Sequence, residues 1–331
     1  MWIIFFLFEL ICTDYKLKID YEEESLSSRK SYSSRISNSY IDGIFSRGRI
    51  KEIETSAGCY NIKFNLDATV LAVGLNDGNG VVLYETKGFT VIDVIDRDDT
   101  VSALDWIDDP FDDLNRDKDD QSSTANLSQL LAVGGFDGVV SIYSITPFSL
   151  SNAFVTPLYD VKVRSAVSTL SFLKDTATSY APFPLALAIG EQDGTVKMFV
   201  TDGNQDQFKS FTRMAKIDTH DSTVLSITFG FIEDGIIMAC GTKEGLIRVN
   251  LLQLEKNEWK QSQLLFERQQ TGAIRALRFN HDSTTLVIGG YDKKVLFVDT
   301  QLFQIVREID ADGTVSSSFS NSSSFIFFLR V

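Results

Sequence analysis

The sequence predicts an all-β protein built from repeated four-stranded antiparallel sheets, and three observations lead to this prediction. A string of the type LAVGLNDG recurs along the chain, turn-forming residues end each copy, and a further apolar stretch follows each turn. A string that recurs at a nearly regular spacing is typical of repeat architectures, in which each copy forms one structural unit. The copies lie at 71–78, 131–138, 187–194, 238–245 and 286–293.

Each copy contains a glycine and, three residues later, an acidic residue. The glycines are Gly74, Gly134, Gly190, Gly241 and Gly289, and the acids are Asp77, Asp137, Asp193, Glu244 and Asp292. A second glycine follows the acid in every copy except the last, where Lys293 takes its place. Glycine accepts a positive φ and Asp caps its own turn, so this pair predicts a tight turn between two strands. We therefore expect the five acids to be structural.

Each repeat accommodates four strands. The apolar run before the turn is short and bounded by turn residues, which indicates a strand buried on both faces. One strand with alternating apolar positions precedes it, and two strands follow the turn, the last of them more polar. We expect five complete sheets at 58–99, 100–164, 165–221, 222–270 and 271–313. Polar insertions at 108–129 and 174–184 account for repeats longer than about 40–45 residues.

The two ends of the chain predict one further, partial or composite sheet. Residues 49–55 look like an outer strand and 314–331 like two inner strands, so we expect them to share a sheet. Its third strand comes from 14–23, with the apolar stretch 2–10 as partner; the alternative is a truncated chain whose full relative has seven sheets. Residues 1–48 are otherwise predicted to be an apolar stretch followed by a flexible Ser-rich segment.

The repeated string resembles that of the WD-repeat β-propeller family over roughly residues 49–331. The Trp-Asp dipeptide that names the family is absent, and pairs such as Tyr84-Glu85 replace it. The family's histidine occurs only at His220, in THDSTV. The resemblance implies a β-propeller of five complete blades plus a partial or composite one. It also implies a structural polar pair between His220 and Glu244, and it leaves the equivalent tether in doubt elsewhere.

The resemblance also implies where partners bind. In this family, the residue just before the turn acid faces the top rim of the ring and contacts partner proteins. The corresponding rim candidates are Asn76, Phe136, Gln192, Lys243 and Tyr291, with Arg275 as a polar companion. Phe136 and Tyr291 are the foremost candidates, because a few exposed aromatic residues carry most of the energy of many interfaces. The alternative is that they pack on neighbouring loops.

Composition and motifs argue against several other functions. A net charge of −14 is unsuited to binding a nucleic-acid backbone, which requires clustered positive charge. The chain has two histidines and no phosphate-binding glycine motif, so we expect no catalytic residues and no cofactor. The acidic loop resembles a calcium loop at its start but lacks the required Gly and Glu, carrying Asp120 and Asn126 instead, so no metal is expected.

The cysteines and the N-terminal stretch bear on localisation. Cys240 occupies a small apolar position of the repeat and is expected to be buried, whereas Cys12 and Cys59 show no pairing logic. This favours a reducing, cytoplasmic compartment. The apolar stretch is too short for a transmembrane helix and is at most a weak secretory signal.

We interpret the chain as a non-enzymatic interaction scaffold that binds partner proteins, of unknown identity, on the rim of its propeller. Two alternatives remain: a subunit of a coat or trafficking complex, and an enzyme on a propeller scaffold that uses acids of the central channel. The sequence predicts neither the partner nor the oligomeric state.

Overall fold

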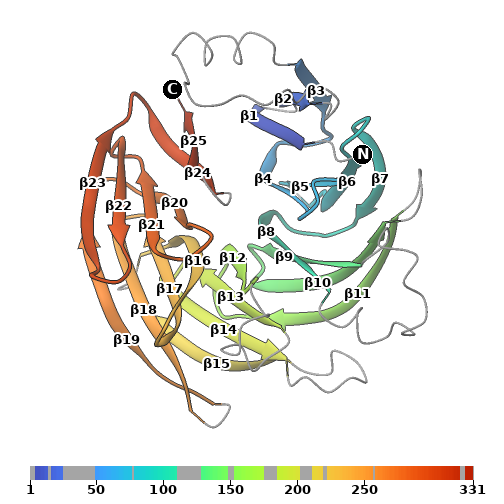
Figure 1. Cartoon of the computed structure of the whole chain (residues 1–331). Coiled ribbons are helices and arrows are strands. Elements are labelled where there is room, and N and C mark those ends of the chain that lie inside the picture. Colours follow the sequence, from blue (N-terminus) through green and yellow to red (C-terminus); the bar gives the residue numbers. More distant parts are fainter. Residues whose placement is uncertain are drawn as a thin grey trace, which may run out of the picture.

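The computed structural model describes residues 4–13, 16–24, 49–76, 78–109, 128–147, 153–174, 185–201, 211–218, 222–255, 258–320 and 325–330. Within these residues the chain is all-β, and its sheets stand around a common axis as a ring (Figure 1). The predicted fold class, five four-stranded antiparallel blades plus a partial or composite one, is confirmed.

The five complete blades are antiparallel sheets whose strands follow one another in chain order. The first contains β4 (Cys59–Phe64), β5 (Val70–Leu75), β6 (Val81–Glu85) and β7 (Thr90–Ile95). The second contains β8 (Val101–Asp108), β9 (Gln129–Gly135), β10 (Val139–Pro147) and β11 (Ala153–Lys162). The third contains β12 (Val167–Phe172), β13 (Ala186–Glu191), β14 (Thr195–Thr201) and β15 (Phe211–Asp218). The fourth contains β16 (Val224–Ile232), β17 (Gly235–Thr242), β18 (Leu246–Glu255) and β19 (Glu258–Gln269). The fifth contains β20 (Ile274–Phe279), β21 (Thr285–Gly290), β22 (Lys294–Asp299) and β23 (Gln304–Asp310).

The two ends of the chain form separate sheets. The N-terminal sheet joins β1 (Ile4–Thr13), β2 (Lys16–Glu24) and β3 (Arg49–Glu54), and the C-terminal sheet joins β24 (Thr314–Ser320) to β25 (Phe325–Arg330). The pairing expected between 49–55 and the C-terminal strands is therefore not the one observed, because β3 lies beside β2, with Lys51 opposite Ile19. β2 and β3 are much closer in the chain than β3 and the C-terminal strands, so their pairing closes a shorter loop at a lower cost in entropy. Residues 25–48, including the Ser-rich segment, lie outside the described residues.

The first strand of each blade faces the axis of the ring. β4, β8, β12, β16, β20 and β24 contact one another in that order, so β24 takes the place of a sixth inner strand. Hydrogen bonds join these strands across blades: the Ser102 hydroxyl donates to the carbonyl of Val167 at 2.6 Å, and the Ser168 hydroxyl to that of Val224 at 2.5 Å. Each first strand of the complete blades therefore has a fixed position against the next.

The marker glycines permit this close approach between blades. A Cβ on Gly134 would lie 2.6 Å from Cγ1 of Val167, the first residue of the next blade's inner strand. The next blade is nearest in the same way at Gly74, Gly241 and Gly289, where the partners are Val101, Ile274 and Val315. At Gly190, Thr169 of the same blade is nearer, at 2.6 Å, and Val224 of the next blade lies at 3.0 Å. Such a distance leaves no room for any side chain, and this explains why glycine recurs at this position of the repeat.

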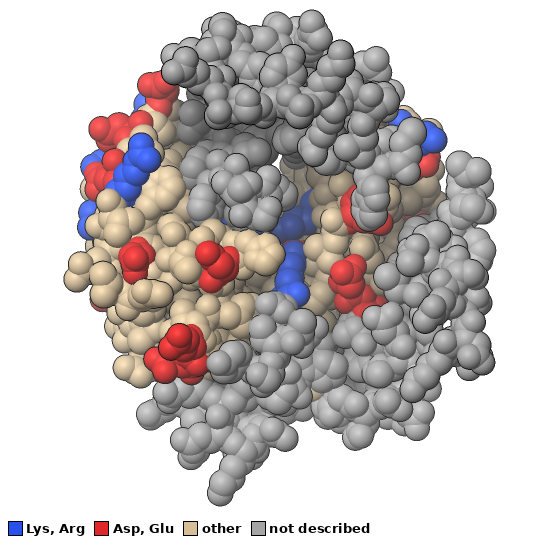
Figure 2. Space-filling model, in the orientation of Figure 1, with Lys and Arg blue, Asp and Glu red and all other residues tan. Residues whose placement is uncertain are grey.

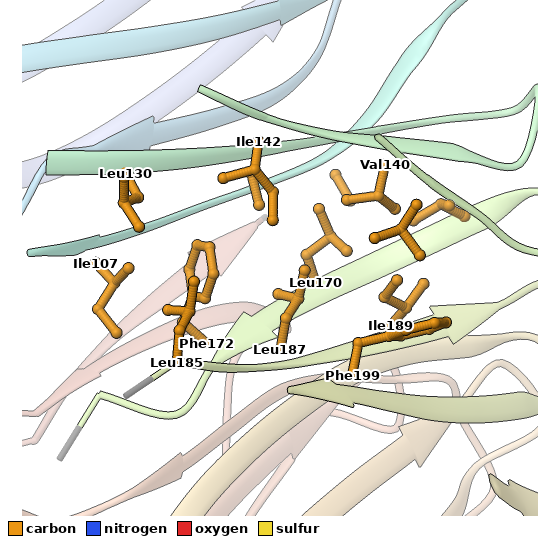
Figure 3. Close-up of a cluster of buried hydrophobic side chains, with 14 residues drawn as sticks. Ile107, Leu130, Val140, Ile142, Leu170, Phe172, Leu185, Leu187, Ile189 and Phe199 are labelled. Carbon is orange, nitrogen blue, oxygen red and sulfur yellow. The ribbon is translucent and has the colours of Figure 1, made fainter. Parts of the chain in front are cut away.

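The hydrophobic core lies between neighbouring blades rather than inside any one of them. In the cluster of Figure 3, Ile107, Leu130 and Ile142 of the second blade pack against Phe172 and Leu187 of the third, and all five are buried. A sheet this small cannot bury its own faces, so each blade depends on its neighbours for a dry interior.

Candidate functional site

The acid-containing turns hold the rim of the propeller in a repeated geometry. The carboxylate Oδ1 atoms of Asp137, Asp193 and Asp292 each accept a hydrogen bond from the backbone N–H two residues later, at 3.0, 2.9 and 3.2 Å. This is the local cap that makes Asp a favoured turn residue. In the Glu244 turn, the Thr242 hydroxyl accepts the equivalent hydrogen bond at 3.0 Å. Asp77 and His220 lie outside the described residues, so the expected His220–Glu244 pair stays a prediction.

The residue after each acid has a positive φ in all five turns. Four are glycines, Gly78, Gly138, Gly194 and Gly245, with φ between 73° and 89°. The fifth is Lys293, at φ 61°, where a side chain costs about 1 kcal/mol or more.

Each rim residue is fixed to its own blade by one backbone hydrogen bond. The N–H groups of Asn76, Phe136, Gln192, Lys243 and Tyr291 donate to the carbonyls of Gly58, Thr100, Ala166, Thr223 and Ala273 respectively. Every acceptor directly precedes the first strand of the blade. The backbone of the rim therefore shares the rigidity of the inner strands, and only the side chains differ from blade to blade.

Phe136 lies on the rim beside an aromatic residue of the preceding blade. The centroid of its ring is 5.3 Å from that of Tyr60, with an interplanar angle of 83°. This edge-to-face arrangement is one that aromatic pairs favour. Both side chains stay substantially exposed, Phe136 at 36% and Tyr60 at 56%. The pair thus forms an apolar surface across the junction of the first two blades.

Tyr291 is 42% exposed and lies under a cation. The Arg275 guanidinium is 5.4 Å from the centroid of its ring, within the range of a cation–π interaction. Arg275 is thus a companion of Tyr291, and it occupies the position of the β20 strand that Tyr60 occupies in β4. Each of these positions is the extra residue of a β-bulge, which turns its side chain onto the rim. Gln192 and Lys243 are exposed, and Asn76 is half-buried.

A polar tether that the sequence did not reveal holds the second blade. Arg97, in the loop before β8, donates to both carboxylate oxygens of Asp137 at 2.9 and 3.1 Å and to the carbonyls of Val133 and Val139. The Arg97 side chain is 8% exposed. Arg97 therefore tethers the Asp137 turn in the way that the resemblance leads one to expect of the family's histidine. In the third blade, Glu191 is fully buried, pairs with Lys197 at 2.5 Å and accepts the N–H of Ser165.

A pocket opens beside this part of the rim. It measures about 640 Å³ and lies between the end of β11 and strand β14. Lys162, Arg164 and Lys197 line it together with Asp193 and Phe199. Its lining is therefore more basic than acidic, although the whole chain is strongly acidic.

The central channel contains a second charged group of residues. The carboxylate of Asp105 on β8 is 2% exposed, and its Oδ1 lies 3.2 Å from Lys63 Nζ and 3.0 Å from Lys174 Nζ. Its Oδ2 accepts the backbone N–H of Phe172 at 2.8 Å. Burial would raise the pKa of Asp105, but Lys174, Lys63 and this N–H outweigh it and lower the pKa to about 2. A carboxylate held this firmly in its ionised form is a weak base, unsuited to acid–base catalysis near neutral pH.

The cysteines differ from expectation. Cys240 is fully buried, as its place in the repeat predicts, and burial raises the pKa of its thiol to about 12. Cys59, however, is disulfide-bonded. The interpretation that Cys59 has no disulfide partner is therefore wrong. This removes the argument for a reducing compartment, and the cytoplasmic assignment stays a prediction.

Within the described residues, no cluster of His, Cys, Asp and Glu has the composition of a metal site. No helix in this part of the chain is long and apolar enough to cross a membrane. The acidic loop at 110–127 lies outside the described residues.

Comparisons with known proteins agree with this geometry. The family model described as "WD domain, G-beta repeat" matches residues 261–299. No curated protein matches the sequence. A chain in the crystal structure of the Saccharomyces cerevisiae Sqt1 superposes with a TM-score of 0.60 at 13% identity, over 96% of this chain and 76% of that one. A chain in the crystal structure of the mitotic checkpoint complex gives a TM-score of 0.50 at 20% identity, over 75% of this chain and 63% of that one.

The ring of four-stranded sheets, with its capped turns and glycine-mediated blade contacts, defines this chain as a β-propeller. The repeat model matches from the last strand of the fourth blade to the third strand of the fifth, and the two structural neighbours share the fold, in agreement with a WD-repeat propeller. The resemblance in the sequence is thereby confirmed.

Proposed function

We propose that the protein is a non-enzymatic scaffold that binds a partner protein on the rim of the propeller, with Phe136 and Tyr60 as the main anchor. The observation that carries the proposal is this exposed edge-to-face pair at the junction of two blades. Aromatic residues are enriched in interfaces, and an anchor that is already ordered in the free protein loses little entropy on binding.

The second anchor, Tyr291 with Arg275, supports the same surface. Both aromatic sites occupy the residue before the turn acid, and both are fixed by the same backbone hydrogen bond to the inner strand. A partner that contacts both sites therefore meets a surface whose spacing is set by the ring. Rigid positioning of this kind favours binding without rearrangement of the scaffold.

The experiment compares the proteins recovered by the wild-type chain and by the variants Phe136→Ala and Tyr291→Ala from native lysate, using quantitative mass spectrometry. Leu302→Ala is the matched control, because Leu302 is 67% exposed but lies in the turn before β23, away from the acid-containing turns. We expect one set of partners to be lost from both rim variants and kept by the control. Unchanged recovery with both rim variants would remove the rim proposal.

A further inference from the structure

The central channel of this acidic protein is lined by positive charge. Lys63 on β4, Lys174 after β12 and Arg278 on β20 come from the first, third and fifth blades. In Figure 2, Lys and Arg surface marks the middle of the ring, whereas most of the visible acidic surface lies on the blades around it. A chain with a net charge of −14 thus concentrates cations at its axis.

Three charged residues of the channel share one position of the repeat. Lys63, Asp105 and Arg278 lie opposite Ala72, Ala132 and Val287 at the same step of their blades' inner strands. The equivalent residues of the third and fourth blades are Ser171 and Thr228. The ring of blades therefore turns these side chains toward a common axis, and the pattern is a property of the fold rather than of one loop.

The only carboxylate among these side chains is fully engaged. Asp105 uses one oxygen for Lys63 and Lys174 and the other for the N–H of Phe172. It therefore orients the two ammonium groups and neutralises one positive charge. Each ammonium group keeps donors to spare, because Lys has three N–H bonds. The lysine side chains are 36% and 33% exposed, so they are accessible from the channel.

Of the three channel cations, Arg278 has the fewest contacts that offset its positive charge. Its guanidinium makes no hydrogen bond or ion pair with a described residue, and Asp105 attracts it only through space. Burial lowers the pKa of Arg278, and its charge in turn contributes to lowering the pKa of Lys63. Asp105 acts to raise the pKa of Lys63, but burial and the charges of Lys174 and Arg278 outweigh it and lower the pKa. Among the described residues, these three cations and one carboxylate leave a surplus of two positive charges within one partly dehydrated space.

We propose that the central channel is a binding site for a small oxyanion with at least two negative charges, of the phosphate class, held by Arg278, Lys63 and Lys174. A guanidinium presents paired N–H donors that match two oxygens of a phosphate, and the two ammonium groups supply point charges to the others. An ion of this charge neutralises the surplus and satisfies the free donors. Three ligands from alternate blades converge inside the ring, an arrangement that suits a compact ion better than a protein surface.

The test is isothermal titration calorimetry of the full chain with inorganic phosphate and with pyrophosphate, in chloride buffers of constant ionic strength. We expect saturable binding of one ion per chain, tighter for pyrophosphate. Arg278→Gln should weaken it by about tenfold or more, as expected for loss of a charge-assisted contact. Arg307→Gln is the matched control, because Arg307 lies on the outer strand β23 of the same blade, over Phe297. It should bind as the wild type does.

Lys174→Gln provides a second variant, should Arg278→Gln fold poorly, since it keeps the Asp105 contacts with Lys63 and Phe172. It should also weaken binding. No saturable binding, or equal weakening by Arg307→Gln, would overturn the proposal, as would binding that both channel variants leave unchanged. The rim proposal is separate: Phe136→Ala should bind phosphate normally, so failure of either proposal is recognised independently of the other.

Discussion

Replacing Asp105 by Asn should destabilise the propeller by about 2–3 kcal/mol at neutral pH. The amide has nearly the shape of the carboxyl but no charge, so the variant resembles the protonated wild type. A pKa lowered from 3.8 to about 2 is equivalent to about 2–3 kcal/mol of stability from the ionised form. Because Asp105 is 2% exposed, solvent screening removes little of this energy.

The pH dependence follows from the direction of the shift. A carboxyl whose pKa is lowered on folding stabilises the native state fully above its unfolded pKa, near 4, and loses that contribution as the pH falls through the folded pKa, near 2. The advantage of the wild type over Asp105→Asn should therefore be complete at pH 7 and about half as large at pH 3.

Urea unfolding followed by tryptophan fluorescence measures this difference, because the neighbouring Trp106 is 1% exposed. Asp312→Asn is the control, since it removes the same charge from an exposed turn and should change stability by less than about 0.5 kcal/mol. If Asp105→Asn is as stable as this control at pH 7, or if its deficit is equally large at pH 3, the channel ion pairs do not stabilise the fold as argued.

Two further predictions test the repeat itself by thermal or urea unfolding. Gly134→Ala should cost about 1–3 kcal/mol, because its Cβ would lie 2.6 Å from a valine of the next blade, whereas Gly88→Ala, with 3.6 Å to its nearest neighbour, should be tolerated. Equal effects would show that blade packing does not require the glycine. Lys293→Gly should stabilise the chain by about 0.5–1 kcal/mol through relief of its positive φ, while Lys243→Gly, in a turn position without positive φ, should give no gain. A loss at residue 293 would contradict the strain argument.

The repeat made the blades predictable because each of its signals has a local cause. The acid-Gly step predicts the turn, and the turn in turn gives the register of the two strands beside it, as with Gly134 opposite Val140. The position before the acid also supplied the rim candidates, whose role in binding stays a prediction. Phe136 and Tyr291 are exposed there, although their companions were only half foreseen: Arg275 was a candidate, and Tyr60 was missed.

Features that depend on contacts between blades could not be predicted from the sequence. Asp105 and Lys174 are 69 residues apart, and nothing in either segment indicates that they form an ion pair. Aligning the inner strands would have shown Lys63, Asp105 and Arg278 at one position, where other blades carry hydroxyl side chains. It would not have shown which way those side chains face, because that depends on the ring closing around them.

The ring forms without any Trp-Asp pair, because other contacts join its blades. Between the second and third blades, Gly134 admits Val167, the Ser102 hydroxyl bonds to the Val167 carbonyl, and Arg97 secures the Asp137 turn. Each contact needs only one residue of a given type, and none needs a Trp-Asp pair.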